Sequence, residues 1–216
     1  MNTDFARQQM IEQQVRAWDV LDMKVLNALK EVPREMFVPE VFSALAFADT
    51  EIPIGHGQMM MTPTIEGRVL QALGLEGSEK VLEIGTGSGF LTAVLAKLSA
   101  HVTSIDIYDD FLDAAKDRLA ECDIDNVDLI NMDGMKQLPK GTFDAIAVTG
   151  SVQTFDPRFV DALSPGGRLF VVVGDAPAMS AMRVTRFDEH STQSDTLFET
   201  DLAPLVHGAL PPQFSF

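Results

Sequence analysis

Short apolar runs alternate with amphipathic segments along the central part of the chain. The apolar runs are rich in β-branched side chains, which is typical of strands buried in a parallel sheet. The segments between them repeat apolar residues at helical spacing. Strands are therefore predicted at residues 81–84, 101–106, 127–131, 143–149 and 168–173, and helices at residues 63–73, 91–98, 111–119 and 159–163. This alternation predicts an α/β fold, a Rossmann-like doubly wound sheet with right-handed crossovers.

The two ends of the chain follow different patterns. Residues 3–16 and 22–31 have the spacing of amphipathic helices. Residues 179–187 and 196–201 are predicted strands joined by a polar stretch, which indicates an antiparallel hairpin on the sheet edge. The apolar, proline-rich tail at 204–216 is expected to pack back on the domain. We expect one domain, with a helical cap and substrate loop at 1–62, a cofactor-binding core at 63–175, and a hairpin and tail at 176–216.

Three glycines at alternate positions, Gly85, Gly87 and Gly89, separate the first predicted strand from its helix. A chain without Cβ atoms can turn tightly there and let a ligand approach the free N–H groups of the helix start. The spacing differs from the Gly-x-Gly-x-x-Gly of dinucleotide enzymes, which speaks against a nicotinamide oxidoreductase. Glu83 beside the loop suits a ligand with an ammonium or sulfonium group, and S-adenosyl-L-methionine carries both. The predicted cofactor loop therefore comprises Glu83, Gly85, Thr86, Gly87, Ser88 and Gly89.

Polar or glycine residues also end the other predicted strands. Ligands of open α/β sheets bind at these carboxyl ends, where Asp106 is placed to accept hydrogen bonds from ribose hydroxyls. Asp133 could accept from the amine of adenine, although an Asp-Gly pair is also an ordinary turn. The predicted cofactor contacts beyond the glycine loop are Asp106, Ile107, Asp133, Gly134 and Thr149.

The passage at residues 49–63 has the prolines and glycines of a loop but is unusually apolar. Solvated loops are rarely so apolar, so we expect this passage to pack over the glycine loop as a substrate wall; a buried connector is the alternative. Within it, His56 lies between two glycines and is a candidate substrate contact or a satisfied loop histidine. Thr62 and Pro63 have the sequence of a helix start, with Thr62 as the N-cap.

The composition excludes several functions. A net charge of −16 would repel phosphate backbones and anionic membrane surfaces, so we expect neither a nucleic-acid nor a membrane partner. Cys122 is the only cysteine, which leaves no internal disulfide. The four histidines are scattered without metal-binding spacing, so no metal is predicted. The N-terminus lacks the apolar region of a signal peptide, and a cytoplasmic monomer is expected.

Residues 81–90 resemble motif I of class I S-adenosylmethionine-dependent methyltransferases. A longer pattern, which covers nearly the whole chain, resembles the protein-L-isoaspartate O-methyltransferase family. It comprises Arg34, Phe37-Val38-Pro39, Ala48-Asp49, Ile52-Pro53-Ile54-Gly55-x-Gly57-Gln58, the glycine loop, residues 92–96, Asp133-Gly134 and residues 143–149. The resemblance implies a seven-stranded sheet with a terminal antiparallel hairpin. It also implies methylation of isoaspartyl carboxylates in damaged proteins or peptides, with S-adenosylhomocysteine as product.

The same resemblance implies where the methyl acceptor binds. The substrate contacts that it implies are Ile54, Gly55, His56, Gly57, Gln58, Pro204 and Leu205, with Ala203 in place of the family's valine before Pro204. The chain departs from the family at Met61, which stands where the family has its active-site serine. A thioether cannot donate a hydrogen bond as a hydroxyl does. The candidate catalytic positions are therefore Met61 itself and the neighbouring Thr62, which carries a hydroxyl. Two alternatives follow: a changed acceptor such as a small carboxylic acid, or a non-catalytic S-adenosylmethionine-binding module.

Overall fold

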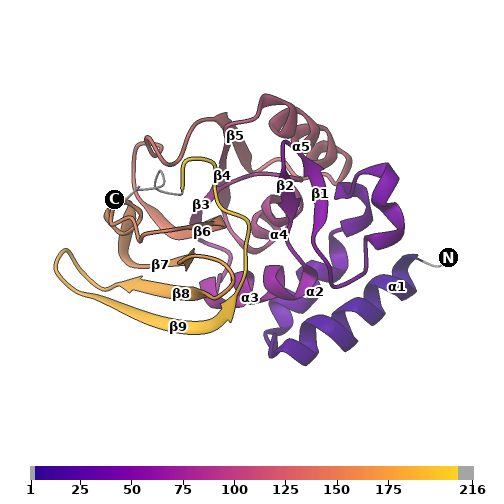
Figure 1. Ribbon diagram of the computed structural model, residues 1–216, viewed down its shortest axis with the longest axis horizontal. Helices are drawn as coiled ribbons and strands as arrows, with labels where there is room; N and C mark the ends of the chain where they lie inside the picture. The colour runs from indigo at the N-terminus through magenta and orange to yellow at the C-terminus, as the bar shows by residue number, and fades with distance from the viewer. Residues whose placement is uncertain (1–2, 209–216) are drawn as a thin grey trace, which may run out of the picture.

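The computed structural model describes residues 3–208, and a seven-stranded sheet forms its centre (Figure 1). The strands are β3 (Lys80–Ile84), β4 (His101–Asp106), β5 (Val127–Asn131), β6 (Phe143–Val152), β7 (Leu163–Val173), β8 (Met179–Arg186) and β9 (Thr192–Thr200). Their order across the sheet is β5-β4-β3-β6-β7-β8-β9. Strands β3 to β7 run parallel to their neighbours, whereas β8 and β9 are antiparallel. The predicted Rossmann-like sheet with an antiparallel hairpin at its edge is confirmed.

Helices surround the sheet and build the N-terminal cap (Figure 1). The cap comprises α1 (Thr3–Met10), which continues as a π-helical turn (Ile11–Val15) and a 3-10 turn (Arg16–Trp18), then α2 (Met23–Glu31) and two 3-10 turns (Arg34–Phe37 and Glu40–Leu45). The remaining helices are α3 (Pro63–Leu73), α4 (Phe90–Leu98), α5 (Asp109–Glu121) and α6 (Arg158–Asp161). Asp22 caps α2 and Thr62 caps α3, each through its side-chain oxygen. The helical cap predicted from the apolar spacing is confirmed.

Alternate residues of the central strands belong to opposite faces of the sheet. Val81 packs into the larger hydrophobic cluster together with the N-terminal helices, α3 and α4, while Leu82 and Ile84 pack into the smaller cluster on the other face. The period of two is the ordinary consequence of the pleat. Glu83 therefore lies on the face covered by α4, in a position that an apolar residue would usually occupy.

The apolar passage at residues 49–63 is more regular than the sequence predicts. It forms a small antiparallel hairpin of β1 (Ile52–Gly55) and β2 (Gln58–Met60), in which Ile52 pairs with Met60 and Pro53 with Met59. Gly55, His56 and Gly57 make its turn, all three with positive φ. The prediction of a loop was wrong, because the prolines and glycines stand at the strand edge and in the turn, where neither interrupts the pairing.

Residues 132–142 between β5 and β6, where the sequence predicts no helix, form turns around Gly134, Pro139 and Gly141. Two strand boundaries differ from the prediction, and the first is that of β7, which begins at Leu163 instead of residue 168. The last strand, β9, begins at Thr192 instead of residue 196. Its early residues are polar because β9 is an edge strand whose outer side remains exposed, so that hydrophobic alternation does not mark its start.

The chain beyond β9 returns to the sheet. Ser151 of β6 forms a parallel bridge with Pro204, and its hydroxyl donates to the carbonyl oxygen of Leu202 at 2.7 Å. The expected packing of the tail is thus seen as far as residue 208, and residues 209–216 lie outside the described part of the chain. Within residues 3–208, no helix combines the length and the apolar character that crossing a membrane requires.

Candidate functional site

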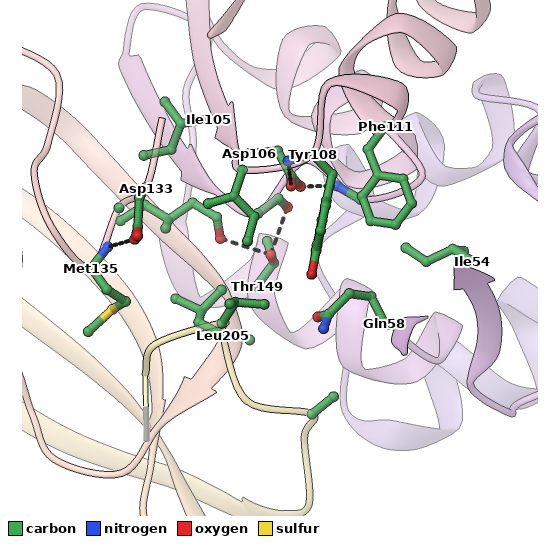
Figure 2. Close-up of a pocket in the computed structure, with 18 of the residues that line it drawn as sticks. Ile54, Gln58, Ile105, Asp106, Tyr108, Phe111, Asp133, Met135, Thr149 and Leu205 are labelled. Atoms are coloured by element: carbon green, nitrogen blue, oxygen red, sulfur yellow. Dashed lines mark hydrogen bonds between the residues drawn. The ribbon is translucent and has the colours of Figure 1, made fainter. Parts of the chain in front are cut away.

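A cavity of about 670 Å³, here called the outer cavity, opens at the carboxyl edge of the sheet (Figure 2). It lies where β3 is flanked by β4 and β6, the switch point at which open α/β sheets bind ligands. Its walls come from Ile54, Gln58 and Met59 of the small hairpin, Ile84, Gly85 and Gly87, Ile105 to Tyr108 and Phe111, Met132 to Met135, Thr149, Gly150, and Leu202, Ala203, Leu205 and Val206 of the returning chain.

The glycine loop approaches β6 so closely that a side chain has no room at its first position. Gly85 has φ of +100°, and a Cβ atom built there would lie 2.3 Å from Oγ1 of Thr149. The same hydroxyl donates to the carbonyl oxygens of Ile84 at 2.9 Å and Gly85 at 2.7 Å. Thr149 therefore fixes the turn from β3 into the loop, and the absence of a Cβ keeps the cavity surface open to a ligand.

Asp106, at the end of β4, holds the glycine loop from the other side. Its Oδ2 accepts from the backbone N–H of Gly87 at 2.9 Å, and its Oδ1 accepts from that of Tyr108 at 3.0 Å. Burial raises the pKa of Asp106, although these backbone hydrogen bonds oppose the shift. Each oxygen keeps a lone pair, so the carboxylate can also accept from the hydroxyls of a ribose.

Glu83 faces an inner cavity of about 320 Å³ that shares Gly85, Gly87 and Thr149 with the outer one. Its side chain is fully buried, and its Oε2 accepts from the hydroxyls of Thr92 and Ser104. Its Oε1 has no partner. Burial raises the pKa of Glu83 to about 8, against those two hydrogen bonds. An orphaned buried oxygen next to a cavity is what a cationic ligand group such as an ammonium would satisfy.

Asp133 also lines the outer cavity but is already engaged by the protein. Its Oδ1 accepts from the backbone N–H of Met135, and its Oδ2 lies 2.8 Å from Nδ1 of His207 and 3.0 Å from Nζ of Lys136. Burial acts to raise the pKa of Asp133, but the hydrogen bonds from Lys136 and His207 prevail and lower it. Asp133 therefore takes part in the turn that the sequence analysis gives as an alternative, and it also lies beside the outer cavity.

The two candidate catalytic positions lie in different surroundings. Met61 is buried and lines the inner cavity, and its carbonyl oxygen accepts from Nη2 of Arg34 at 2.8 Å. Arg34 is itself fully buried, is paired with Glu66 and also donates to the carbonyl oxygen of Ala46, so its contact with the backbone of Met61 is fixed. Thr62 does not reach either cavity: its hydroxyl caps α3 and lies 2.9 Å from that of Thr64.

The structure brings most of the predicted residues to the two cavities. The outer cavity is lined by Ile54, Gln58, Gly85, Gly87, Asp106, Ile107, Asp133, Gly134, Thr149 and Leu205, and the inner one also by Met61, Glu83, Thr86 and Ser88. Gly55, His56, Gly57, Thr62, Gly89 and Pro204 line neither cavity. Gly89 instead starts α4, and a Cβ there would lie 2.8 Å from that of Ala115. Among residues 3–208, no group of three His, Cys, Asp or Glu side chains is placed to hold a metal ion.

Several lining residues escape the sequence analysis. Tyr108 follows Asp106 by two positions, and its nearness to a ligand-binding carboxylate was a usable signal. Phe111 has the spacing of an ordinary core residue in a helix, and nothing in the sequence separates it from one. His207, which stands alone in the sequence, meets Asp133 only because the chain after β9 folds back over the sheet edge.

Comparison with known proteins connects this geometry to a family. The family model for protein-L-isoaspartate(D-aspartate) O-methyltransferase matches residues 5–210. A protein-L-isoaspartate O-methyltransferase of Rhodopseudomonas palustris strain HaA2 is 39% identical over 94% of this chain and 85% of its own length. One from Aliivibrio fischeri strain ES114 is 36% identical over 95% of this chain and 98% of its own length.

Solved structures show the same fold. A crystal structure from Plasmodium falciparum, assigned as a protein-L-isoaspartate O-methyltransferase in complex with S-adenosyl-L-homocysteine, matches with a TM-score of 0.78. The match covers 93% of this chain and 98% of the other at 23% identity. A second protein-L-isoaspartate O-methyltransferase structure also matches with a TM-score of 0.78, over 92% of this chain and 65% of the other at 21% identity. At this identity the two structures establish the likeness of the fold.

Proposed function

This chain belongs to the protein-L-isoaspartate(D-aspartate) O-methyltransferase family, and we propose that its two joined cavities hold S-adenosylmethionine and an isoaspartyl carboxylate for methyl transfer. As a member of that family it is an S-adenosylmethionine-dependent methyltransferase. Near full-length similarity to enzymes named for isoaspartate favours this acceptor over a small carboxylic acid and over a non-catalytic binding module. The isoaspartyl-containing proteins or peptides are thus its partners in the reaction.

The observation that carries the proposal is the pairing of an open glycine loop with the Asp106 carboxylate. Asp106 would accept from the ribose hydroxyls of the donor, and the glycine loop would let the donor lie against its backbone. Asp133 would face the adenine amine through the lone pairs that its contacts with the protein leave free. The unpartnered Oε1 of Glu83 fits the ammonium of the donor's methionyl part.

Methyl transfer requires the donor and the acceptor carboxylate to be oriented, and it requires no proton transfer. S-adenosylmethionine supplies a methyl group on a positively charged sulfur. An acceptor carboxylate with a pKa near 4 is already ionised at pH 7, so the chain needs no general base. Ile54, Met59 and Met61 form an apolar wall beside the glycine loop and exclude water from the place where the inner and outer cavities join. The protein's contribution is to hold the reactants in line in a dry site.

Transfer of tritiated methyl groups to an isoaspartyl peptide tests this function, with the matched aspartyl peptide as control. We expect the isoaspartyl peptide to be methylated and the aspartyl peptide to remain unlabelled. Calorimetry with S-adenosylhomocysteine measures binding of the donor product separately. Binding without methylation of either peptide would contradict the isoaspartyl acceptor, and a lack of binding would contradict the cofactor site itself.

Met61→Ser tests how the acceptor is held. A hydroxyl at this position can donate to the acceptor carboxylate, and a hydrogen bond to a charged group contributes about 1.5–3 kcal/mol. We therefore expect kcat/KM for the isoaspartyl peptide to rise roughly tenfold or more, while the affinity for S-adenosylhomocysteine stays within about twofold. Met60→Ser is the matched control, because Met60 lines the same cavity but lies one residue further from the family's serine position. An equal gain in both variants would argue against a specific role for position 61.

A further inference from the structure

The His56 side chain joins the turn of the small hairpin to the loop after β4. The imidazole of His56 stacks on the ring of Tyr108, with centroids 4.0 Å apart and planes 9° apart. Both rings also meet the edge of Phe111 at 5.3 Å. Nε2 of His56 lies 2.8 Å from Oδ2 of Asp110, whose pKa is lowered by this hydrogen bond. Four residues from two distant parts of the sequence thus form one contact.

The backbone at His56 depends on that contact. Its φ of +51° lies in the left-handed region, between Gly55 at +113° and Gly57 at +71°. A side chain other than glycine is uncommon there, although His and Asn tolerate the region better than most. A Cβ atom added at Gly57 would meet nothing within 4 Å, so the turn is otherwise open to solvent on that side. On the other side a Cβ atom built at Gly55 would lie 3.6 Å from the ring of Phe111, so the turn meets α5 through the His56 side chain and the Gly55 backbone.

Tyr108 connects His56 to the outer cavity. Tyr108 and Phe111 line the outer cavity, whereas His56 does not. Figure 2 shows the Tyr108 ring extending from the loop beside Asp106 toward Gln58 of the small hairpin. The backbone N–H of Tyr108 donates to Asp106, the predicted ribose acceptor. One face of the ring is covered by His56, so the ring cannot change its orientation without breaking the stack.

We propose that His56 is a positioning residue for donor binding, an inference that rests on the proposed function. By stacking on Tyr108 it holds the aromatic wall beside Asp106, and by the same contact it holds the small hairpin over the outer cavity before the donor enters. The donor then binds to a wall that is already ordered, and less of the binding free energy is spent on ordering the loop.

His56→Asn removes the imidazole while keeping a residue that accepts positive φ. We expect the Kd of S-adenosylhomocysteine and the KM of S-adenosylmethionine to rise about three- to tenfold, which corresponds to roughly 0.65–1.4 kcal/mol. We expect kcat to change less than about twofold, because His56 does not touch the reacting groups. Asp110→Asn removes only the charged partner, and since that pair is solvent-exposed its effect should stay below about twofold.

The chain offers a matched control at the opposite end of β4. His101 lies 3.0 Å from Asp128, and the two side chains are 41% and 68% exposed, against 39% and 66% for His56 and Asp110. His101→Asn therefore removes an equivalent histidine–aspartate pair without touching Tyr108. We expect its Kd and KM to equal those of the wild type.

Tyr108 is the only tyrosine, so fluorotyrosine labelling gives a single ¹⁹F signal from the wall itself. His56→Asn should shift or broaden this signal in the ligand-free protein, and His101→Asn should leave it unchanged. An unchanged signal, or an unchanged Kd in His56→Asn while the wild type binds S-adenosylhomocysteine, would overturn the inference. A loss in Asp110→Asn equal to that in His56→Asn would assign the effect to the hydrogen bond with Asp110 and overturn the role of the stack. If the wild type binds no S-adenosylhomocysteine, the proposed function itself fails.

Discussion

The glycine-loop side of the outer cavity and its outer rim are held by different kinds of contact. The glycine-loop side comprises the loop with Glu83 and Asp106, which are buried and bound by backbone N–H groups or buried hydroxyls. The rim comprises the turn of the small hairpin and residues 202–208. Its side-chain contacts include two histidine–aspartate pairs, His56 with Asp110 and His207 with Asp133, in which both histidines are partly exposed. The stack of His56 on Tyr108 and the hydrogen bond from Ser151 to Leu202 add to them.

This difference predicts that contacts in the two regions contribute unequally to donor binding. Buried hydrogen bonds in a low-dielectric interior are strong, and losing one partner leaves the other unsatisfied at a cost of about 1–3 kcal/mol. Exposed ion pairs contribute about 0–1 kcal/mol each. The glycine-loop side should therefore be the more sensitive to the loss of a single contact, while each exposed pair at the rim should contribute less to donor binding. Substitutions in the two regions should accordingly differ in the size of their effects.

The largest effect is expected from Gly85→Ala. The added Cβ would lie 2.3 Å from Thr149 Oγ1, and the φ of +100° is strained for alanine. We expect a loss of roughly 2–4 kcal/mol in the free energy of unfolding, and a fall in S-adenosylhomocysteine affinity of about a hundredfold or more, because the loop must move to relieve the clash. Chemical denaturation and calorimetry measure the two quantities.

Gly77→Ala separates strain from clash. Gly77 has nearly the same φ, +99°, but a Cβ there would meet nothing within 4 Å. This variant should lose about 1–2 kcal/mol of stability from backbone strain alone and bind S-adenosylhomocysteine like the wild type. Equal losses of affinity in both variants would show that the contact with Thr149 does not shape the loop.

Asp106→Asn is expected to have the next largest effect. The amide keeps the size of the carboxylate but loses its charge and one acceptor, so hydrogen bonds to ribose hydroxyls weaken. We expect S-adenosylhomocysteine affinity to fall about ten- to hundredfold by calorimetry. The control is Asp144→Asn, because Asp144 binds the backbone N–H of Lys80 and the hydroxyl of Ser164 at the other end of the sheet. A similar loss of affinity in the control would point to a general effect on the fold.

Glu83 makes donor binding depend on pH. Burial raises the pKa of Glu83 from 4.5 to about 8, so the carboxyl is largely protonated at pH 6. An ammonium ligand favours the carboxylate, and binding should therefore release a proton. We expect affinity to rise with pH between 6 and 8, by at most about tenfold per pH unit, and then to level off. Calorimetry in buffers of different ionisation enthalpy measures the released proton.

The raised pKa of Glu83 makes the stability of the fold fall with rising pH, whereas it makes donor affinity rise. Because the folded-state pKa of Glu83 lies above its ordinary value, its contribution to stability is full below about pH 4.5 and is lost as the pH rises through about 8. Glu83→Gln should remove the contribution of Glu83 to both dependences. Glu66 also has a pKa raised to about 8 by burial, but the variant leaves it in place, so the difference between the two proteins isolates Glu83. An unchanged pH dependence of affinity in Glu83→Gln would contradict the assignment.

Local signals in the sequence were sufficient for the parallel sheet and its glycine-loop edge. The apolar runs of β3, β4, β6 and β7 are buried on both faces and are legible without tertiary information. Asp106 and Gly85 could be placed at the cavity because strand ends and loop glycines have fixed positions in such a sheet, while their roles toward the donor stay a prediction. The confirmed part of the prediction is thus the part in which backbone geometry dictates the residue type.

The rim could not be predicted in the same way. The contact of His56 with Tyr108 joins residues from different elements, and no periodicity in the chain announces it. The small hairpin was missed because β1 and β2 are short and apolar on both sides, and because β1 contains Pro53, a residue more typical of loops. Histidine–aspartate pairs across the rim depend on how surface segments meet, which the sequence alone does not specify.

His207 is expected to have the smallest effect. Its Nδ1 lies 2.8 Å from Oδ2 of Asp133, where Lys136 already supplies a cation at 3.0 Å. His207→Gln can retain a hydrogen bond to the carboxylate, and residues 202–208 stay attached through Ser151, whose backbone N–H donates to Ala203 and whose carbonyl oxygen accepts from Leu205. We therefore expect S-adenosylhomocysteine affinity to fall by no more than about threefold.

Ser151→Ala, which removes the hydroxyl bond to Leu202 beneath the same segment, should weaken binding more than His207→Gln does, because that bond is buried. The reverse order would show that the histidine contact, and not the bonds to β6, holds the rim closed over the donor.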